Sequence, residues 1–250
     1  MGTKNRHDED LAFLAYCSEK DIQQLAKLLI YDKKGKKRIT TQILSDKSFM
    51  ALNGSSEQWR KSWQLVAGEL QHFGGDTIVN LFRRKGVFYR EILKDTSKKS
   101  GVKFDKKGAT WEIEDKLIEH FVKKLWGEMS EEERDAALKS MNLGDFTGGK
   151  FDWRSASSST LFGGAAAGAW YAWAASAAKA VFAPAIFSRA AIAGASSLVA
   201  QRGATAFLGP AVAVALTVPA VSGTAYRVTV PATIQIAYMR QKYIKKDRFE

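Results

Sequence analysis

Apolar residues recur at every third or fourth position along the first part of the chain. Ile22, Leu25 and Leu29 follow Ser18, a residue type whose side-chain oxygen caps the N-terminus of a helix. Their spacing lays one apolar stripe along a helix of about 3.6 residues per turn. The pattern predicts a helix that begins directly after Ser18.

A second stripe, rich in tryptophan, runs from Trp59 to Leu70. Ser56 is placed to cap this helix, and the pair Gly74-Gly75 is expected to end it because glycine favours helix termini. Asp76 would then cap the helix that follows. We therefore predict a glycine hinge between two helices.

Helical spacing returns from Trp111 to Leu125, and Ser130 with Glu133 has the pattern of a capping box that opens another helix. Lysine- and glycine-rich stretches at 32–37 and 97–101 predict loops. Because no alternation typical of strands occurs, the predicted fold class is all-α, with an N-terminal helical bundle followed by an Ala/Gly-rich apolar helical region.

The composition changes near Asp152, because residues 153–246 contain no acidic side chain and are rich in alanine and glycine. Two uncharged windows, Ser155–Ala178 and Gly203–Tyr226, have 24 residues each, and about 20 are enough to cross a bilayer core. Alanine and glycine insert weakly, so we expect marginal, conditional spans. The predicted divisions are a soluble bundle (1–150), the apolar region (151–239) and a basic tail (240–250).

The net charge is +12, and its distribution favours an acidic partner. Residues 1–152 hold 28 basic and 24 acidic groups, whereas residues 153–250 hold 10 and 2. Most of the surplus therefore belongs to the apolar part, which favours an anionic membrane surface over nucleic acid. No nucleic-acid motif accompanies it, so we do not expect a nucleic-acid partner.

Basic residues near the apolar windows are the predicted lipid-binding groups. Each Lys or Arg close to an anionic surface contributes about 1 kcal/mol to binding. The alternative for the tail is a solvated terminal helix. The predicted lipid-binding residues are Lys179, Arg189, Arg202, Arg240, Lys242, Lys245 and Lys246.

Gly164 and Gly168 form a small-xxx-small pattern, which lets two helix backbones approach closely in a membrane. We predict that both glycines pack against another helix, either within the chain or in a second copy of it. The alternative is a soluble Ala-rich helix packed in a core, since buried helices are apolar on all sides as well.

The few titratable residues outside these patterns point to structure rather than catalysis. His72 lies between Glu69 and Asp76, where it is either a switch that titrates near neutrality or, as we favour, a structural residue at a helix end. Arg227 needs a partner if it is buried, and Asp76 or Glu69 is the predicted one. These three positions, His72, Asp76 and Arg227, form the predicted structural or switch set.

We predict no metal site, no cofactor and no enzymatic activity. The acids Glu112, Glu114, Asp115 and Glu119 are interpreted as a solvated helix face. The single cysteine, Cys17, excludes an internal disulfide framework and is expected to be buried. The first ten residues, MGTKNRHDED, have no apolar run, so we expect no secretory signal peptide.

Three stretches together resemble the YaaW-like family of enterobacterial proteins. They are Trp63–Asp76 (WQLVAGELQHFGGD), Trp111–Phe121 (WEIEDKLIEHF) and Val221–Ala237 (VSGTAYRVTVPATIQIA). Their order and spacing match over nearly the whole chain. The resemblance implies an N-terminal part similar to the helical ubiquinol–cytochrome c chaperone domain, and it brings no catalytic residues.

These observations predict a cytoplasmic bacterial protein with peripheral or inner-membrane association. Its marginal helices would pack on the N-terminal bundle and then insert into anionic bilayers, as pore-forming helical proteins do. The alternative is a non-enzymatic assembly factor or chaperone that holds a membrane-protein client.

Overall fold

The structure is a computed structural model that describes residues 6–77, 86–143, 166–183, 185–187 and 226–244. These residues form helices and loops without a named strand, so the all-α prediction is confirmed for them. The helices are η1 (Glu9–Tyr16), α1 (Glu19–Ile30), η2 (Ile43–Ser45), α2 (Lys47–Ala51), α3 (Gln58–Lys61), α4 (Trp63–Thr77), α5 (Tyr89–Lys99), α6 (Thr110–Glu128), α7 (Glu131–Ser140), α9 (Ala166–Phe182) and α13 (Tyr226–Tyr243).

Helices α1, α6 and α7 confirm the sequence pattern closely. The Ser18 side chain accepts a hydrogen bond from the Asp21 backbone N–H at 3.2 Å and so caps α1. At α7, the Ser130 backbone N–H donates to Glu133 at 2.8 Å, while the Glu133 backbone N–H donates back to the Ser130 side chain, which completes the capping box. Local capping therefore determines where α1 and α7 begin.

The predicted glycine hinge is wrong. Helix α4 runs through Gly74 and Gly75 to Thr77, so the double glycine does not end it. The predicted cap at Ser56 is also wrong, because α3 begins at Gln58 and the chain bends at Ser62 before α4 starts. The helix expected after Asp76 lies outside the described residues.

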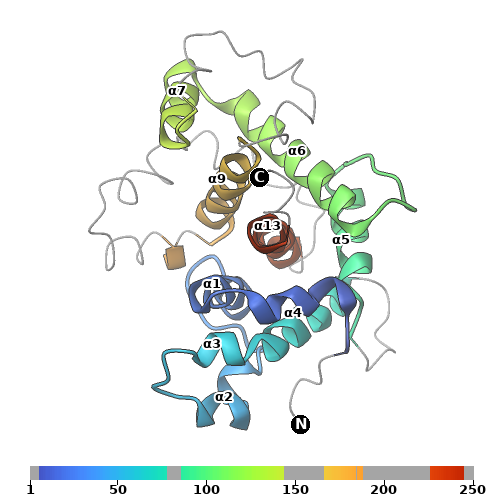
Figure 1. Ribbon diagram of the computed structural model, residues 1–250, viewed down its shortest axis with the longest axis vertical. Coiled ribbons are helices and arrows are strands. Elements are labelled where there is room, and N and C mark those ends of the chain that lie inside the picture. Colours follow the sequence, from blue (N-terminus) through green and yellow to red (C-terminus); the bar gives the residue numbers. More distant parts are fainter. Residues whose placement is uncertain (1–5, 78–85, 144–165, 184, 188–225, 245–250) are drawn as a thin grey trace.

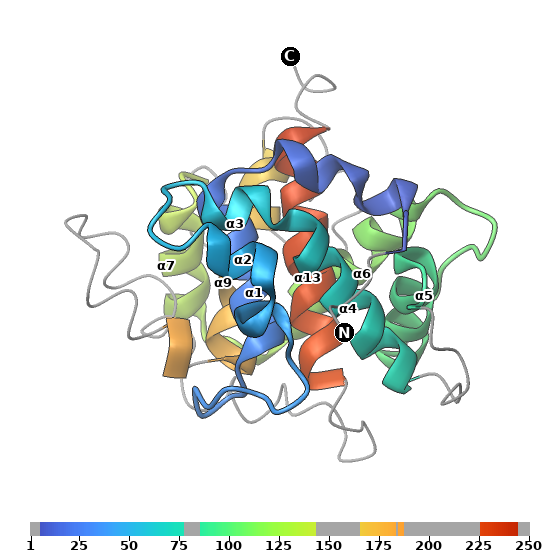
Figure 2. The same cartoon turned by 90° about the horizontal axis from the view of Figure 1, so that it is seen from below.

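Helix α13 lies at the centre of the molecule, surrounded by α1, α4, α5, α6 and α9 (Figures 1 and 2). Most of its side chains are buried, and the apolar ones belong to the same core as those of the N-terminal helices. The change of composition near residue 150 therefore does not separate two cores. The proposed tail boundary at 240 falls inside α13, so its first residues are part of the buried helix.

Helix α9 comprises the described part of the first apolar window. It packs along α13 and presents buried small residues such as Ala174 and Ala178 to the core. Its Trp170 and Trp173 rings lie 5.1 and 5.7 Å from the Trp126 ring of α6, in edge-to-face arrangements. These aromatic contacts and small side chains hold α9 against the bundle.

No helix among the described residues is long and apolar enough to cross a membrane. The predicted second window, Gly203–Tyr226, lies outside the described residues apart from Tyr226, which begins α13.

Candidate functional site

Arg240 of α13 forms a buried ion pair with Glu114 of α6. Its Nε lies 2.9 Å from Glu114 Oε2, and only 1% of the Glu114 side chain is exposed. Tyr89 donates its hydroxyl proton to the other oxygen of Glu114 at 2.7 Å, and Arg240 Nη2 donates to the Asp10 carbonyl at 2.6 Å. Burial alone would lower the pKa of Arg240, but the Glu114 carboxylate more than offsets it and the pKa lies above its usual value.

A second ion pair joins α13 to the start of α1. Lys242 Nζ lies 2.8 Å from Asp21 Oδ2, and the Tyr243 hydroxyl donates to the same oxygen at 2.5 Å. Burial opposes ionisation of Asp21, yet hydrogen bonds from Lys242, Tyr243 and Ser18 hold its pKa below its ordinary value. Because Lys242 and Arg240 point at buried carboxylates, their charges bind the last turns of α13 to the bundle.

Lys179 of α9 lies against α1 in a less favourable setting. Its Nζ donates to the neutral amide oxygen of Gln24 at 2.7 Å. Removal from water lowers the pKa of Lys179 to about 8, because burial disfavours the charged ammonium more than the distant Asp21 carboxylate favours it. The charge of Lys179 therefore weakens the attachment of α9 at neutral pH.

Gln235 of α13 is a buried polar group without a hydrogen-bond partner among the described residues. Its side chain is fully buried, and neither amide atom has a hydrogen-bond partner among the described residues. Burying an unpaired amide costs about 1–3 kcal/mol. By contrast, Thr233 on the same helix donates to the Thr229 carbonyl at 2.8 Å.

Helices α9 and α13 run antiparallel. Tyr171, early in α9, bonds to Asp115 of α6, next to the Glu114 that binds Arg240 late in α13. At the other end, Gly35 lies in the loop that follows α1, and Ala185 lies just beyond the end of α9. A Cβ on Gly35 would be 3.5 Å from the Cβ of Ala185. The end of α9 and the start of α13 therefore lie at one end of the molecule, opposite the two ion pairs (Figure 2).

Comparison with known proteins identifies relatives over most of the chain. A Helicobacter pylori UPF0174 protein is 34% identical over 184 residues, which cover 71% of this chain and 87% of that protein. The chain belongs to the UPF0174 family. Another Helicobacter pylori UPF0174 protein is 29% identical over 242 residues, 95% of this chain and 92% of that protein. The YaaW-like resemblance seen in the sequence is thereby confirmed.

Within the UPF0174 family, the YaaW protein of Escherichia coli K12 is 42% identical over 142 residues. The match covers 57% of this chain and spans only 60% of the length of that relative. A model named Domain of unknown function (DUF3944) matches residues 6–39, which comprise η1, α1 and the loop after α1. No solved structure matches the chain.

Of the predicted lipid-binding residues in this UPF0174 chain, three are described: Lys179, Arg240 and Lys242. Each contacts another side chain of the fold, although Lys242 is itself exposed. Their contacts favour a structural role. Outside the described residues lie Arg189, Arg202, Lys245 and Lys246, for which lipid binding stays a prediction.

The predicted packing and switch residues are not brought together among the described side chains. Gly168 is exposed, and no described atom lies within 4 Å of the position a Cβ would take, while Gly164 lies outside the described residues. His72 is exposed on α4, and the Asp76 side chain is not described. Arg227 is exposed at the start of α13, so the condition under which a buried partner was expected for it is not met.

The sequence analysis missed Glu114 and Asp21 as partners of the basic helix end. Glu114 was grouped with a solvated acidic face, but it is buried and paired. A signal was available, because Glu114 lies three, four and seven residues before Leu117, Ile118 and Phe121, and therefore on the apolar stripe. Among the described residues, no group of three His, Cys, Asp or Glu side chains is placed to hold a metal ion.

Proposed function

We propose that this UPF0174 protein is a conditional membrane-associating helical protein. In the packed state the bundle holds α9 and α13, and release of α9 delivers the Ala/Gly-rich region to an anionic bilayer. The bundle then acts as the element that shields the apolar region and sets when it is released.

The observation that carries this proposal is the antiparallel packing of α9 on α13. The 43 residues numbered 183–225 connect the two helices, and their only charges are Arg189 and Arg202. Because both helices place their connected ends at one end of the bundle, the intervening chain begins and finishes there. That placement supports entry into a bilayer as a hairpin, with both anchors on the same side.

The charged side chains of the two helices differ in how well they are paired, which supports a conditional release of α9. Helix α13 is held at its end by the Arg240–Glu114 and Lys242–Asp21 ion pairs. In α9, Lys179 donates to the neutral amide of Gln24 and not to a carboxylate. Helix α9 also packs along α13, whose Gln235 amide is buried without a hydrogen-bond partner among the described residues. Both groups raise the free energy of the packed state, so they lower the cost of detaching α9.

The charge pattern supports an anionic bilayer as the target. Residues 153–246 contain nine basic and no acidic side chains, so no carboxylate opposes the approach of this region to acidic lipids. Alanine and glycine insert only weakly, which suits a segment that enters a bilayer after the surface has attracted it.

The test compares dye leakage from equimolar phosphatidylcholine–phosphatidylglycerol vesicles for the full chain and for a stabilised variant, Lys179→Met with Gln235→Leu. We expect the wild type to release dye and the variant to release it at least about tenfold more slowly, since a tighter α9 adds on the order of 1.4 kcal/mol to the cost of release. Flotation with the vesicles measures binding alongside.

The matched control is Lys20→Met with Gln64→Leu, which makes the same chemical changes at two exposed positions. It should leak dye like the wild type. A wild type that neither floats with the vesicles nor releases dye contradicts the proposal. Co-purification with a specific membrane protein, with vesicles left intact, would instead support the assembly-factor alternative.

A further inference from the structure

We propose that a basic face, defined by Lys33, Lys34, Lys36, Lys37, Lys98 and Arg227, is the surface that docks on anionic phospholipid headgroups. The inference rests on the proposed membrane association and specifies which end of the molecule meets the bilayer. It places the contact at the end opposite the Arg240 and Lys242 ion pairs.

The first part of this face is the loop Asp32–Arg38, which lies where α9 ends. Gly35 adopts a φ of +79°, a left-handed conformation that side chains rarely take, and it makes the tight turn of the loop. A Cβ built on it would lie 3.5 Å from Ala185 Cβ. The loop therefore sits beside the point at which the chain leaves α9 toward residue 188.

The second part lies where the chain returns as α13. The Tyr226 hydroxyl donates to Asp95 at 2.9 Å, and Lys99 Nζ lies 4.4 Å from the centre of the Tyr226 ring. Lys98, which precedes Lys99, and Arg227, which follows Tyr226, are both exposed. Both junctions of the Ala/Gly-rich region are thus flanked by lysine or arginine side chains at one end of the bundle.

The cations of this face outnumber the acids around them. Lys33, Lys34, Lys36 and Lys37 are all exposed. The one acid of the loop, Asp32, accepts the backbone N–H groups of Lys36 and Lys34, each at 2.9 Å, so its carboxylate is used to shape the turn. Those hydrogen bonds lower the pKa of Asp32.

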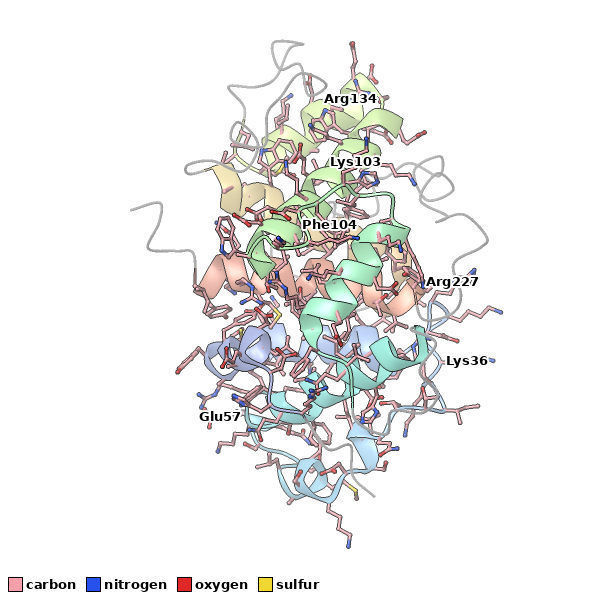
Figure 3. All side chains as sticks on the ribbon, turned by 90° about the vertical axis from the view of Figure 1, so that its right-hand side faces the viewer. Lys36, Glu57, Lys103, Phe104, Arg134 and Arg227 are labelled. Carbon is pink, nitrogen blue, oxygen red and sulfur yellow. The ribbon has the colours of Figure 1, made fainter. Side chains whose placement is uncertain are left out.

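A second acid near this face, Asp95, accepts from Tyr226 and pairs with Lys99 at 3.3 Å. It therefore offsets Lys99 and leaves the charges of Lys98 and Arg227 available. Lys36 and Arg227 project from the same side of the molecule, whereas Glu57 lies toward the other side (Figure 3).

An exposed apolar side chain accompanies the basic loop. Ile39 has 103% of its reference surface exposed, the largest fraction among the exposed large apolar residues described. A cationic surface with a protruding aliphatic side chain is the composition of elements that lie at a lipid headgroup boundary, where the charge attracts the surface and the apolar group enters it. This combination favours a bilayer over a soluble acidic protein as the partner.

The test reverses charge on the full chain at three loop positions, Lys33→Glu, Lys34→Glu and Lys36→Glu. Partitioning onto phosphatidylglycerol-containing vesicles should fall about 100-fold or more, because each lysine at an anionic surface accounts for a factor of roughly five. The fall should vanish on pure phosphatidylcholine vesicles. Ile39→Asn, which removes the apolar group without adding a charge, should weaken binding without changing the salt dependence.

Two matched triple variants separate the outcomes. Reversal of the exposed residues Lys20, Lys124 and Lys139 changes the net charge equally on other surfaces and should lower partitioning by less than about tenfold. Reversal of Lys245, Lys246 and Arg248 tests the C-terminal tail in the same way. Circular dichroism and Tm measurements confirm that each variant folds.

The inference is overturned if the wild type binds and the loop variant binds as tightly as the Lys20, Lys124 and Lys139 control. It is also overturned if only the tail reversal lowers binding, and in both cases membrane association itself stands. Failure of the wild type to bind any vesicle removes the proposed function and this inference together.

Discussion

Arg240 Nε lies 2.9 Å from Glu114 Oε2, at a point where only 12% of the arginine side chain and 1% of the glutamate side chain are exposed. The two residues are 126 positions apart, about half the length of the chain, so the pair joins α13 to a distant helix, α6. Removing one partner leaves the other charge buried and unpaired, which is costly. The pair therefore fixes the register of the central helix against the bundle.

Arg240→Met should destabilise the fold by about 3–5 kcal/mol, because Glu114 is then buried without its counter-charge. Chemical denaturation followed by circular dichroism measures the change. The double variant Arg240→Met with Glu114→Gln should recover more than half of the loss. The exposed pair Arg60–Glu57 supplies the control, since its removal should cost less than about 1 kcal/mol. Equal costs for the two pairs would show that the Arg240 pair is not buried in solution.

Lys179→Met should stabilise the protein by on the order of 1–2 kcal/mol at neutral pH, because a half-buried ammonium without a carboxylate partner in contact is replaced by an apolar group of similar length. The folded-state pKa is about 8 and the ordinary value is 10.5. Since the unfolded chain binds more protons between these values, wild-type stability should rise as pH increases from 8 toward 10.5.

The Lys179→Met variant should lack that rise, and Lys20→Met should retain it. Unfolding curves measured at several pH values across the window provide the readout. The free energy of unfolding of the Lys179→Met variant is subtracted from that of the wild type at each pH. A difference that stays flat or falls between pH 8 and 10.5 would mean that the Lys179 ammonium is exposed to water in the folded protein.

Gln235→Leu should raise the free energy of unfolding by about 1–2 kcal/mol, because leucine fills a similar volume and removes an unpaired amide from the core. Gln71 provides the comparison, since it is equally buried but hydrogen-bonded to the Arg6 backbone at 2.9 and 3.0 Å. Gln71→Leu should therefore destabilise. The same sign for both substitutions would mean that Gln235 has a partner in solution.

Trp170→Ala should loosen α9 and cost about 3 kcal/mol or more, since the ring is buried against Trp126 of α6. Under the proposed function the same variant should release dye from anionic vesicles faster than the wild type. Trp59→Ala is the control, because Trp59 packs on Phe49 rather than on α9. When the two variants are compared at equal free energy of unfolding, Trp59→Ala should leave the leakage rate unchanged. A leakage rate unaffected by Trp170→Ala would separate α9 from membrane activity.

Local pattern predicted the elements whose borders depend on neighbouring residues. The caps at Ser18 and Ser130 and the apolar stripe of α6 were visible because their partners lie within four residues. Gly74 and Gly75 misled the prediction, since glycine weakens a helix by only about 1 kcal/mol and does not by itself end one. Local propensity therefore did not decide where α4 ends.

The polar interior was harder to predict, because the partners are far apart in the sequence. Asp21 and Lys242 are separated by 221 positions, and no local pattern relates them. The sequence does show that a charged residue such as Asp21 lies on the apolar stripe of its helix, which indicates burial. Asp21 precedes Leu25 by four residues and Leu28 by seven, so its burial was predictable even though its partner was not.

The basic face was overlooked for a related reason. The lysines of the loop after α1 were interpreted only as a loop signal, and lipid binding was assigned to the C-terminal region. Only the fold brings that loop next to Ala185, and only the fold directs Arg240 and Lys242 inward.

Membrane insertion is tested most directly by mixing the full-length protein with phosphatidylglycerol-containing vesicles and collecting the vesicles. The vesicles are then washed first with high salt and next with alkaline carbonate. We predict that the wild type is retained through both washes, because the Ala/Gly-rich region has entered the bilayer, and that the Lys179→Met, Gln235→Leu variant is released by salt. Recovery of the wild type in the soluble fraction before any wash would contradict membrane association.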